Sequence, residues 1–110
     1  MATSSTIILI TGANSGVGLA ASGVIASASK DYHVIMTSRN AQNGGKALAE
    51  VKATEGVKGT LSTIQLDQDD PESVKQAAKE VESQFGRIDV LVNNAAIGMS
   101  LTPAESEISS

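Results

Sequence analysis

The chain has 110 residues, of which 41% are hydrophobic and 18% are charged, a balance typical of a single globular domain of ordinary size. Eight Lys and Arg residues against twelve Asp and Glu residues give a net charge of −4, and with one Tyr and one Phe this excludes a basic or aromatic nucleic-acid surface. The absence of cysteine excludes disulfides and thiolate chemistry, and the single histidine cannot build a metal site by itself.

The first predicted element is a buried strand over residues 6–11, a β-branched run that ends at a glycine. A helix is predicted from residue 16 to about residue 29. We expect its small residues at helical spacing to pack against a sheet; these are Ala20, Gly23, Val24 and Ser27. Residues 33–37 predict the second strand.

The second predicted helix runs from residue 42 to about residue 55 and ends at Gly56. Its apolar stripe consists of Ala47, Leu48 and Val51. Residues 61–66 predict a third strand, and their alternation of apolar and polar side chains places it nearer to an edge of the sheet.

The third predicted helix has the clearest start, because Asp70 can cap it and Pro71 suits its first position. Its apolar stripe is predicted to contain Val74, Ala77, Ala78, Val81 and Phe85, and Gly86 stops it. A fourth strand is predicted at residues 88–92.

Four strands joined by three helices predict right-handed crossovers, and therefore an α/β fold with a Rossmann-type parallel sheet and helices on both faces. We expect the sheet to be truncated after the fourth strand. Residues 1–110 would then form a single, partial dinucleotide-binding domain with frayed ends at 1–5 and 105–110. The longest run of large apolar residues, 7–10, is far shorter than the roughly 20 residues that span a bilayer, so we expect a cytoplasmic protein.

The most informative segment is the glycine-rich turn after the first strand, at the start of the first helix. Gly12, Gly16 and Gly18 permit positive φ angles and let backbone N–H groups approach a pyrophosphate, to which the helix N-terminus offers further donors. Asn14 and Ser15 can add side-chain hydrogen bonds, and Val17 follows in the same turn. The alternative is a glycine-rich turn that binds no ligand.

The segment after the second strand discriminates between cofactors. A site for NAD commonly has an Asp or Glu about 20 residues past the glycines, where it binds the ribose 2′-hydroxyl. Here the sequence reads Ser38-Arg39-Asn40, so Arg39 can pair with a 2′-phosphate while Ser38 and Asn40 donate hydrogen bonds. This favours NADP, the alternative being a solvated Arg39 on a surface loop.

Further candidates follow the third and fourth strands, at the carboxyl edge where open parallel sheets bind ligands. Asp67, beside Gln68, could accept a hydrogen bond from an adenine amino group, or could join its acidic neighbours in capping the next helix. Asn93 and Asn94 could tie the fourth strand to its neighbours and border the ribose, or could simply form a turn. His33 starts the second strand at the opposite edge, where we expect a structural role.

These residues together resemble the short-chain dehydrogenase/reductase family of the TGxxxGxG type, and in particular its carbonyl-reductase-like members. Thr11, Gly12, Gly16 and Gly18 match the fingerprint, and Arg39 the NADP-preferring subset. The family's adenine-contacting acid and NNAG motif are matched by Asp67 and by Asn93-Asn94-Ala95, with Ala96 in place of the last glycine. The resemblance implies an NADP-dependent reductase of ketones or aldehydes, with a cofactor site that includes Ala95.

The resemblance also implies that no catalytic residue lies in this chain, because the family's Ser, its Tyr-x-x-x-Lys pair and its helix-borne Asn all follow the NNAG strand. Tyr32 is the single Tyr, and Met36 stands four residues after it. We therefore expect these 110 residues alone to be catalytically incompetent. The alternatives are a non-catalytic module that binds NADP or docks a partner, and a folded relic that binds nothing. The edge of the fourth strand could pair with a complementary C-terminal chain or with a second copy.

Overall fold

The computed structural model describes residues 5–14 and 16–94. Within these residues the elements are β1 (Thr6–Ile10), α1 (Gly16–Ala28), β2 (Tyr32–Ser38), α2 (Ala41–Lys52), β3 (Thr60–Gln65), α3 (Pro71–Gln84) and β4 (Val90–Val92). The predicted alternation of strands and helices is confirmed, with boundaries that differ by up to three residues. No helix in the described part of the chain is both long and apolar enough to cross a membrane.

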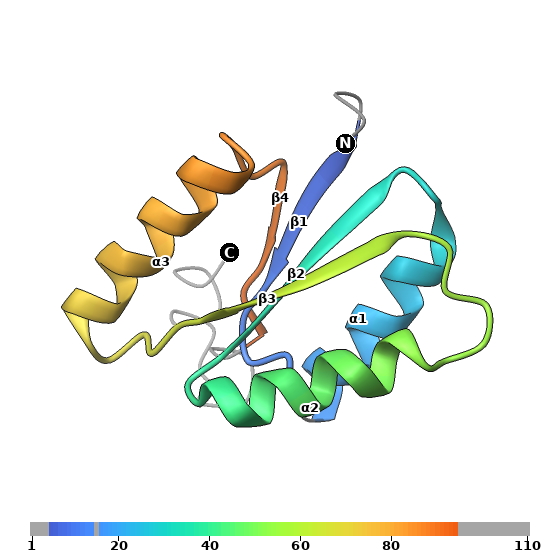
Figure 1. Ribbon diagram of the computed structural model, residues 1–110, viewed down its shortest axis with the longest axis horizontal. Coiled ribbons are helices and arrows are strands. Elements are labelled where there is room, and N and C mark those ends of the chain that lie inside the picture. Colours follow the sequence, from blue (N-terminus) through green and yellow to red (C-terminus); the bar gives the residue numbers. More distant parts are fainter. Residues whose placement is uncertain (1–4, 15, 95–110) are drawn as a thin grey trace, which may run out of the picture.

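The four strands form one parallel sheet in the order β3-β2-β1-β4, so β3 lies at an edge as its alternating pattern predicts. Figure 1 shows α3 on one side of the strands and α1 and α2 on the other. This arrangement confirms the predicted Rossmann-like parallel sheet with helices on both faces. All four strands therefore end at one edge of the sheet, and the loops after them meet there.

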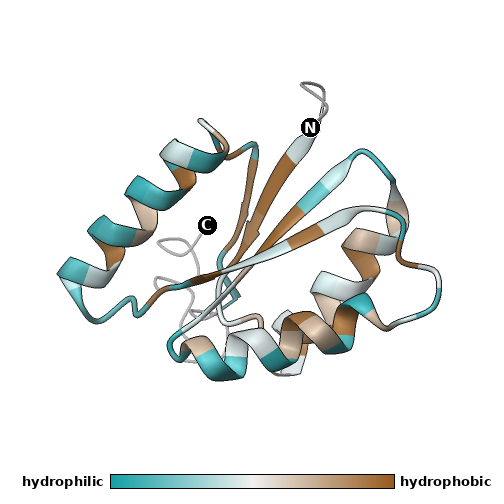
Figure 2. Cartoon of the chain, viewed as in Figure 1, coloured by the Kyte–Doolittle hydropathy of each residue, from teal (hydrophilic) through white to brown (hydrophobic). Residues whose placement is uncertain are grey.

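Two apolar clusters hold the layers together, one on each face of the sheet. On the α1/α2 face, the cluster contains strand residues such as Ile10, Val34 and Met36, with Ala26 and Val51 from the helices. On the opposite face, Ile7, Leu9, Ile35 and Ile64 pack against Ala77 and Val81 of α3. In Figure 2, β1 and β4 are coloured as hydrophobic, and α3 is divided between hydrophobic and hydrophilic residues.

The prediction for the packing face of α1 is wrong. Gly18, Ser22 and Ala26 are the buried residues of this helix, whereas Val24 is 70% exposed. The helix sequence GVGLAASGVIASA contains no charged residue, so polarity does not distinguish its two faces.

The third helix confirms its predicted start, but its apolar stripe is only partly buried. Asp70 caps it, its carboxylate accepting a hydrogen bond from the N–H of Glu72 at 3.0 Å, and Pro71 is the first residue. Ala77 and Val81 are buried and Phe85 is partly buried, whereas Val74 and Ala78 are exposed. The second helix ends at Lys52, before the predicted end, because Thr54 closes a turn on the carbonyls of Glu50 and Val51.

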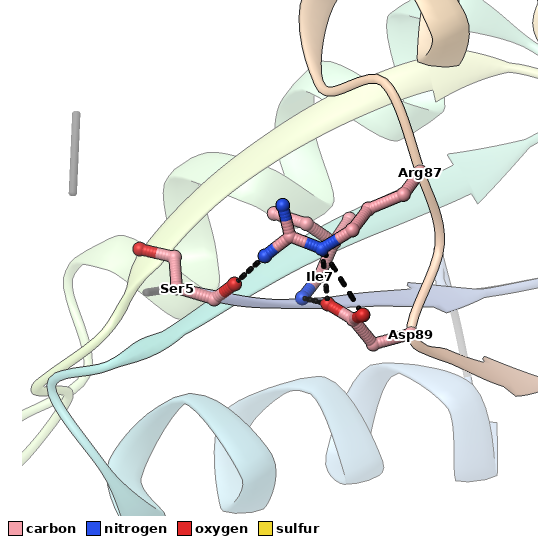
Figure 3. Close-up of polar contacts among 4 residues, drawn as sticks. All are labelled: Ser5, Ile7, Arg87 and Asp89. Atoms are coloured by element: carbon pink, nitrogen blue, oxygen red, sulfur yellow. Dashed lines mark hydrogen bonds and ion pairs between the residues drawn. The ribbon is translucent and has the colours of Figure 1, made fainter. Parts of the chain in front are cut away.

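The fourth strand is shorter than predicted because Asp89 uses its side chain as well as its backbone to bind β1. Its N–H donates to the carbonyl of Ile7 at 2.8 Å, and its carboxylate accepts from the N–H of Ile7 at 2.7 Å. Arg87 donates to the same carboxylate at 3.0 Å and also to the carbonyl of Ser5, as Figure 3 shows. The bond from Ile7 is the main reason why the pKa of Asp89 lies below its usual value.

Candidate functional site

The glycine-rich turn lies at the carboxyl end of β1 and leads into α1. Gly12 and Gly16 have φ angles of +59° and +57°, a region that side chains with a Cβ rarely adopt. Gly18 does not have a positive φ. It is required for close approach, because an added Cβ would lie 2.3 Å from the carbonyl oxygen of Gly12. The turn thereby brings the N-terminus of α1 against the end of the sheet.

Side chains at the end of β4 hold this turn in place. The amide of Asn94 donates to the carbonyl of Gly12 at 3.1 Å, and the Thr11 hydroxyl lies 3.3 Å from Oδ1 of Asn93. The backbone N–H of Thr11 also donates to the carbonyl of Val92 at 3.0 Å. Of the two alternatives for the asparagines, the structure therefore favours the one in which they tie the fourth strand to its neighbour.

The three residues after the core of β2 have different surroundings. Ser38 is 2% exposed, and its hydroxyl donates to the carbonyl of Asn40 at 2.7 Å. The side-chain oxygen of Asn40 caps α2 by accepting from the N–H groups of Gln42 and Asn43, at 2.8 and 3.1 Å. Arg39 has a side chain that is 77% exposed. Arg39 and Asn40 are therefore exposed, whereas Ser38 is buried, and Arg39 is the one of the three with a basic side chain.

The residues after β2 form one rim of the site, and the residues after β3 form the other. Oδ1 of Asp67 accepts from the N–H of Asp69 at 3.0 Å and lies 3.8 Å from Nε of Arg39. The backbone N–H of Asp67 donates to the hydroxyl of Ser73 at 2.9 Å. Asp70 supplies the cap of α3, so Asp67 does not cap that helix.

The turn and the two rims enclose a cleft of about 600 Å³ at the carboxyl edge of the sheet. It brings together six of the predicted site residues: Gly12, Asn14, Arg39, Asn40, Asp67 and Gln68. Gly16, Val17, Gly18, Ser38 and Asn93 do not line it, and Ser15 and Ala95 lie outside the described residues. Asn43 and Asp69, which the sequence analysis did not single out for the site, also line the cleft.

His33 lies at the other end of the sheet. Its ring nitrogens are 2.6 Å from the hydroxyl of Thr60 and 2.9 Å from that of Ser62, and its ring is 4.7 Å from that of Phe85. Burial lowers the pKa of this histidine. These contacts agree with the expected structural role. Among the described residues, no group of three or more His, Asp or Glu side chains could hold a metal ion.

Comparisons with known proteins agree on one family. The family profile described as short chain dehydrogenase matches residues 6–109. The chain is 38% identical over 97 residues to the short-chain dehydrogenase anuI of Penicillium roqueforti, a match that covers 88% of this chain and 37% of that protein. It thus spans about a third of the length of the curated relatives it matches.

Solved structures give the same result. Menthone neomenthol reductase from Mentha piperita superposes with a TM-score of 0.74 at 32% identity, over 84% of this chain and 32% of that one. A metagenomic short-chain oxidoreductase in complex with NADP superposes with a TM-score of 0.71 at 26% identity, over 94% of this chain and 48% of that one.

Proposed function

Because the chain belongs to the short-chain dehydrogenase family, we propose that it is the NADP-binding portion of an oxidoreductase that reduces a ketone or an aldehyde. The observation that carries this proposal is the cleft, in which the glycine turn, Arg39 and Asp67 lie around one cavity at the carboxyl edge of the sheet. A dinucleotide binds at this place in open parallel sheets. The metagenomic relative solved with NADP supports the same type of cofactor.

The turn at the start of α1 suits a pyrophosphate. Gly12 and Gly16 have positive φ angles where the chain turns from β1 into α1, and Gly18 lets α1 approach the carbonyl of Gly12 closely. The first N–H groups of a helix have no partner within it and can bind an anion. The first turn of α1 contains no acidic residue that would repel an anion. We assign the pyrophosphate to this turn, with Asn14, Ser15 and Val17 beside it and Asn93 and Ala95 at the ribose.

Arg39 is the basis of the proposed preference for NADP over NAD. Its exposed guanidinium lies at the mouth of the cleft, where it can donate to a 2′-phosphate. Ser38 and Asn40 contribute indirectly, because their hydrogen bonds fix the backbone on either side of Arg39 and the start of α2. Gln65 adds to this support by donating to the carbonyl of Arg39 at 3.1 Å.

We propose that this chain alone does not catalyse the reduction. When bound, NADPH supplies the hydride for the carbonyl carbon, and the carbonyl oxygen then needs a proton from a positioned acid. Tyr32, the one tyrosine of the sequence, lies at the start of β2, at the opposite end of that strand from the cleft. The residues of this chain would therefore bind and orient the cofactor, and another part of the enzyme would supply the acid.

Calorimetric titration with NADPH and then NADH tests the cofactor proposal directly. Hydrogen bonds to charged groups contribute about 1.5–3 kcal/mol, so NADPH should bind at least about tenfold more tightly than NADH. Arg39→Asp should abolish this preference, whereas Lys30→Asp, an equal change of charge in the turn before β2, should not. A folded sample that binds neither nucleotide would refute the proposal, and the glycine-rich turn would then have a structural role only.

A second candidate function, a partner-docking module, rests on a groove of about 290 Å³ between α3 and β4. Leu91 is paired with Leu9 on the α3 face of the sheet, yet it is 60% exposed, and Val74 is 42% exposed beside it. Parallel sheets are normally covered on both faces. We therefore propose that a complementary polypeptide covers this groove.

Intact mass and sedimentation of the purified material test this second proposal. A second polypeptide that co-purifies with the 11.2 kDa chain and is lost on Leu91→Lys supports it. Lys79→Leu, an exposed change on α3 that is not part of the groove, serves as the control. A single 11.2 kDa monomer, or a homodimer that is lost on Leu91→Lys, contradicts the complementary chain.

A further inference from the structure

The cleft contains an ion pair between its two rims. Arg39 follows β2 and Asp67 follows β3, and these neighbouring strands bring Nε of Arg39 to 3.8 Å from Oδ1 of Asp67. The side chains are 77% and 32% exposed, respectively. The guanidinium proposed to bind a 2′-phosphate therefore faces a carboxylate.

Further acidic residues line the same hollows as Arg39. Asp69 lines the same cleft, and Asp70, Glu72 and Glu80 line a second hollow of about 420 Å³ on which Arg39 and Asp67 also border. Among the described residues that line either hollow, Arg39 is the one basic side chain. The local field at Arg39 thus opposes an incoming dianion more than the residue type alone suggests.

We propose that Asp67 lowers the preference of the cleft for NADP over NAD, by acting as a counter-ion of Arg39 that weakens binding of a 2′-phosphate. This inference rests on the proposed NADP-binding function. NAD carries a hydroxyl at the same position, so the carboxylate affects its binding less. Asp67 therefore narrows the preference for NADP that Arg39 creates.

The alternative role for Asp67, holding Arg39 in a productive orientation, has the opposite consequence and a weaker basis. At 3.8 Å the contact is too long for a hydrogen bond, and the exposed Arg39 side chain keeps its freedom. When the negative charge of Asp67 is removed, the gain in affinity for a 2′-phosphate should therefore exceed any loss caused by a less well oriented Arg39. Asp67→Asn isolates the charge, because asparagine retains the oxygen that accepts from the N–H of Asp69.

Calorimetric titrations with 2′,5′-ADP and 5′-AMP measure this effect on the half of the cofactor that the cleft would hold. Exposed ion pairs are weak, so Asp67→Asn should raise the affinity ratio of 2′,5′-ADP over 5′-AMP by about twofold to fivefold. The increase in this ratio should become smaller as the salt concentration is raised from about 50 to about 500 mM, because salt screens the exposed charge of Asp67. Asp31→Asn is the matched control, since it removes the same charge next to the first residue of β2, at the opposite end of the sheet.

The outcomes separate this inference from the function on which it rests. A wild-type protein that prefers 2′,5′-ADP, with a ratio that Asp67→Asn leaves unchanged or lowers, refutes the role of Asp67 and retains the NADP proposal. An equal rise in Asp31→Asn also refutes it, because the effect would then follow net charge. A folded wild-type protein that binds neither nucleotide overturns both.

Discussion

Replacing Gly18 by alanine places a methyl group where the structure leaves no room for one. The added Cβ would lie 2.3 Å from the carbonyl oxygen of Gly12 and 2.7 Å from the amide nitrogen of Asn94. These two atoms are the partners of the hydrogen bond that ties the glycine turn to the end of β4. The substitution therefore strains α1 and the turn together. Gly23, on the same helix, has no atom within 4 Å of an added Cβ and provides a matched control.

The expected effect is the balance of two opposing contributions. Alanine is favoured over glycine inside a helix by about 1 kcal/mol, which applies in full to Gly23→Ala and less to Gly18 in the first turn. Overpacking costs about 1–3 kcal/mol, and we expect a cost of about 2 kcal/mol at Gly18 because a backbone oxygen cannot rotate away. Gly18→Ala should thus lower the free energy of unfolding by about 1–2 kcal/mol, whereas Gly23→Ala should raise it by about 0.5–1 kcal/mol.

Urea denaturation followed by circular dichroism measures both variants against the wild type. The two variants should differ by about 2 kcal/mol with unchanged m-values. Gly18→Ala should also weaken binding of 2′,5′-ADP, because the turn that receives the pyrophosphate moves. If Gly18→Ala is as stable as Gly23→Ala, the close approach of α1 to Gly12 is wrong, and so is the reason given for a glycine at this position.

Three further predictions concern other parts of the fold. In urea denaturation, Gly44→Ala should be about 1–2 kcal/mol less stable than Gly45→Ala. A Cβ at Gly44 would lie 2.5 Å from the buried hydroxyl of Ser38, whereas a Cβ at Gly45 has no atom within 4 Å. Equal stabilities would contradict this packing of α2. Asp89→Asn should be less stable than the wild type at neutral pH. The difference should disappear as the pH falls through the lowered folded-state pKa of Asp89, and a gap that persists in acid would show that the charge is not responsible. Burial lowers the pKa of His33, so the unfolded chain binds a proton at a higher pH than the folded chain. The free energy of unfolding should therefore fall as the pH drops below about 6.5. An NMR titration that gives His33 a normal or raised pKa would refute this.

Local patterns were enough to predict the order of the elements and the place of the cleft. The cap at Asp70, with Pro71 behind it, located the start of α3 because capping depends on residues adjacent in sequence. The rims formed by Arg39 and Asp67 were predicted because the ends of parallel strands meet at one edge, whatever the details of packing.

Other features depend on contacts between distant residues, and the sequence did not predict them. The buried face of α1 was misjudged because its uncharged residues give no contrast, and the approach of Gly18 to Gly12 decides it. The hydroxyl of Ser38 is occupied by the carbonyl of Asn40, which no residue pattern indicates. Asp89 was not singled out at all, since its role depends on Ile7, which is 82 residues away.

The sequence by itself thus determined the fold class, the strand–turn–helix around the glycines and the basic residue at the rim, because periodicity, caps and turns involve near neighbours in the chain. Only the tertiary structure decided which face of α1 is buried, that Leu91 remains exposed on the sheet, and that Arg39 faces Asp67. The physical reason is that strand order and register place residues from distant parts of the chain within a few ångströms of each other. Burial and electrostatics at the cleft follow from those distances.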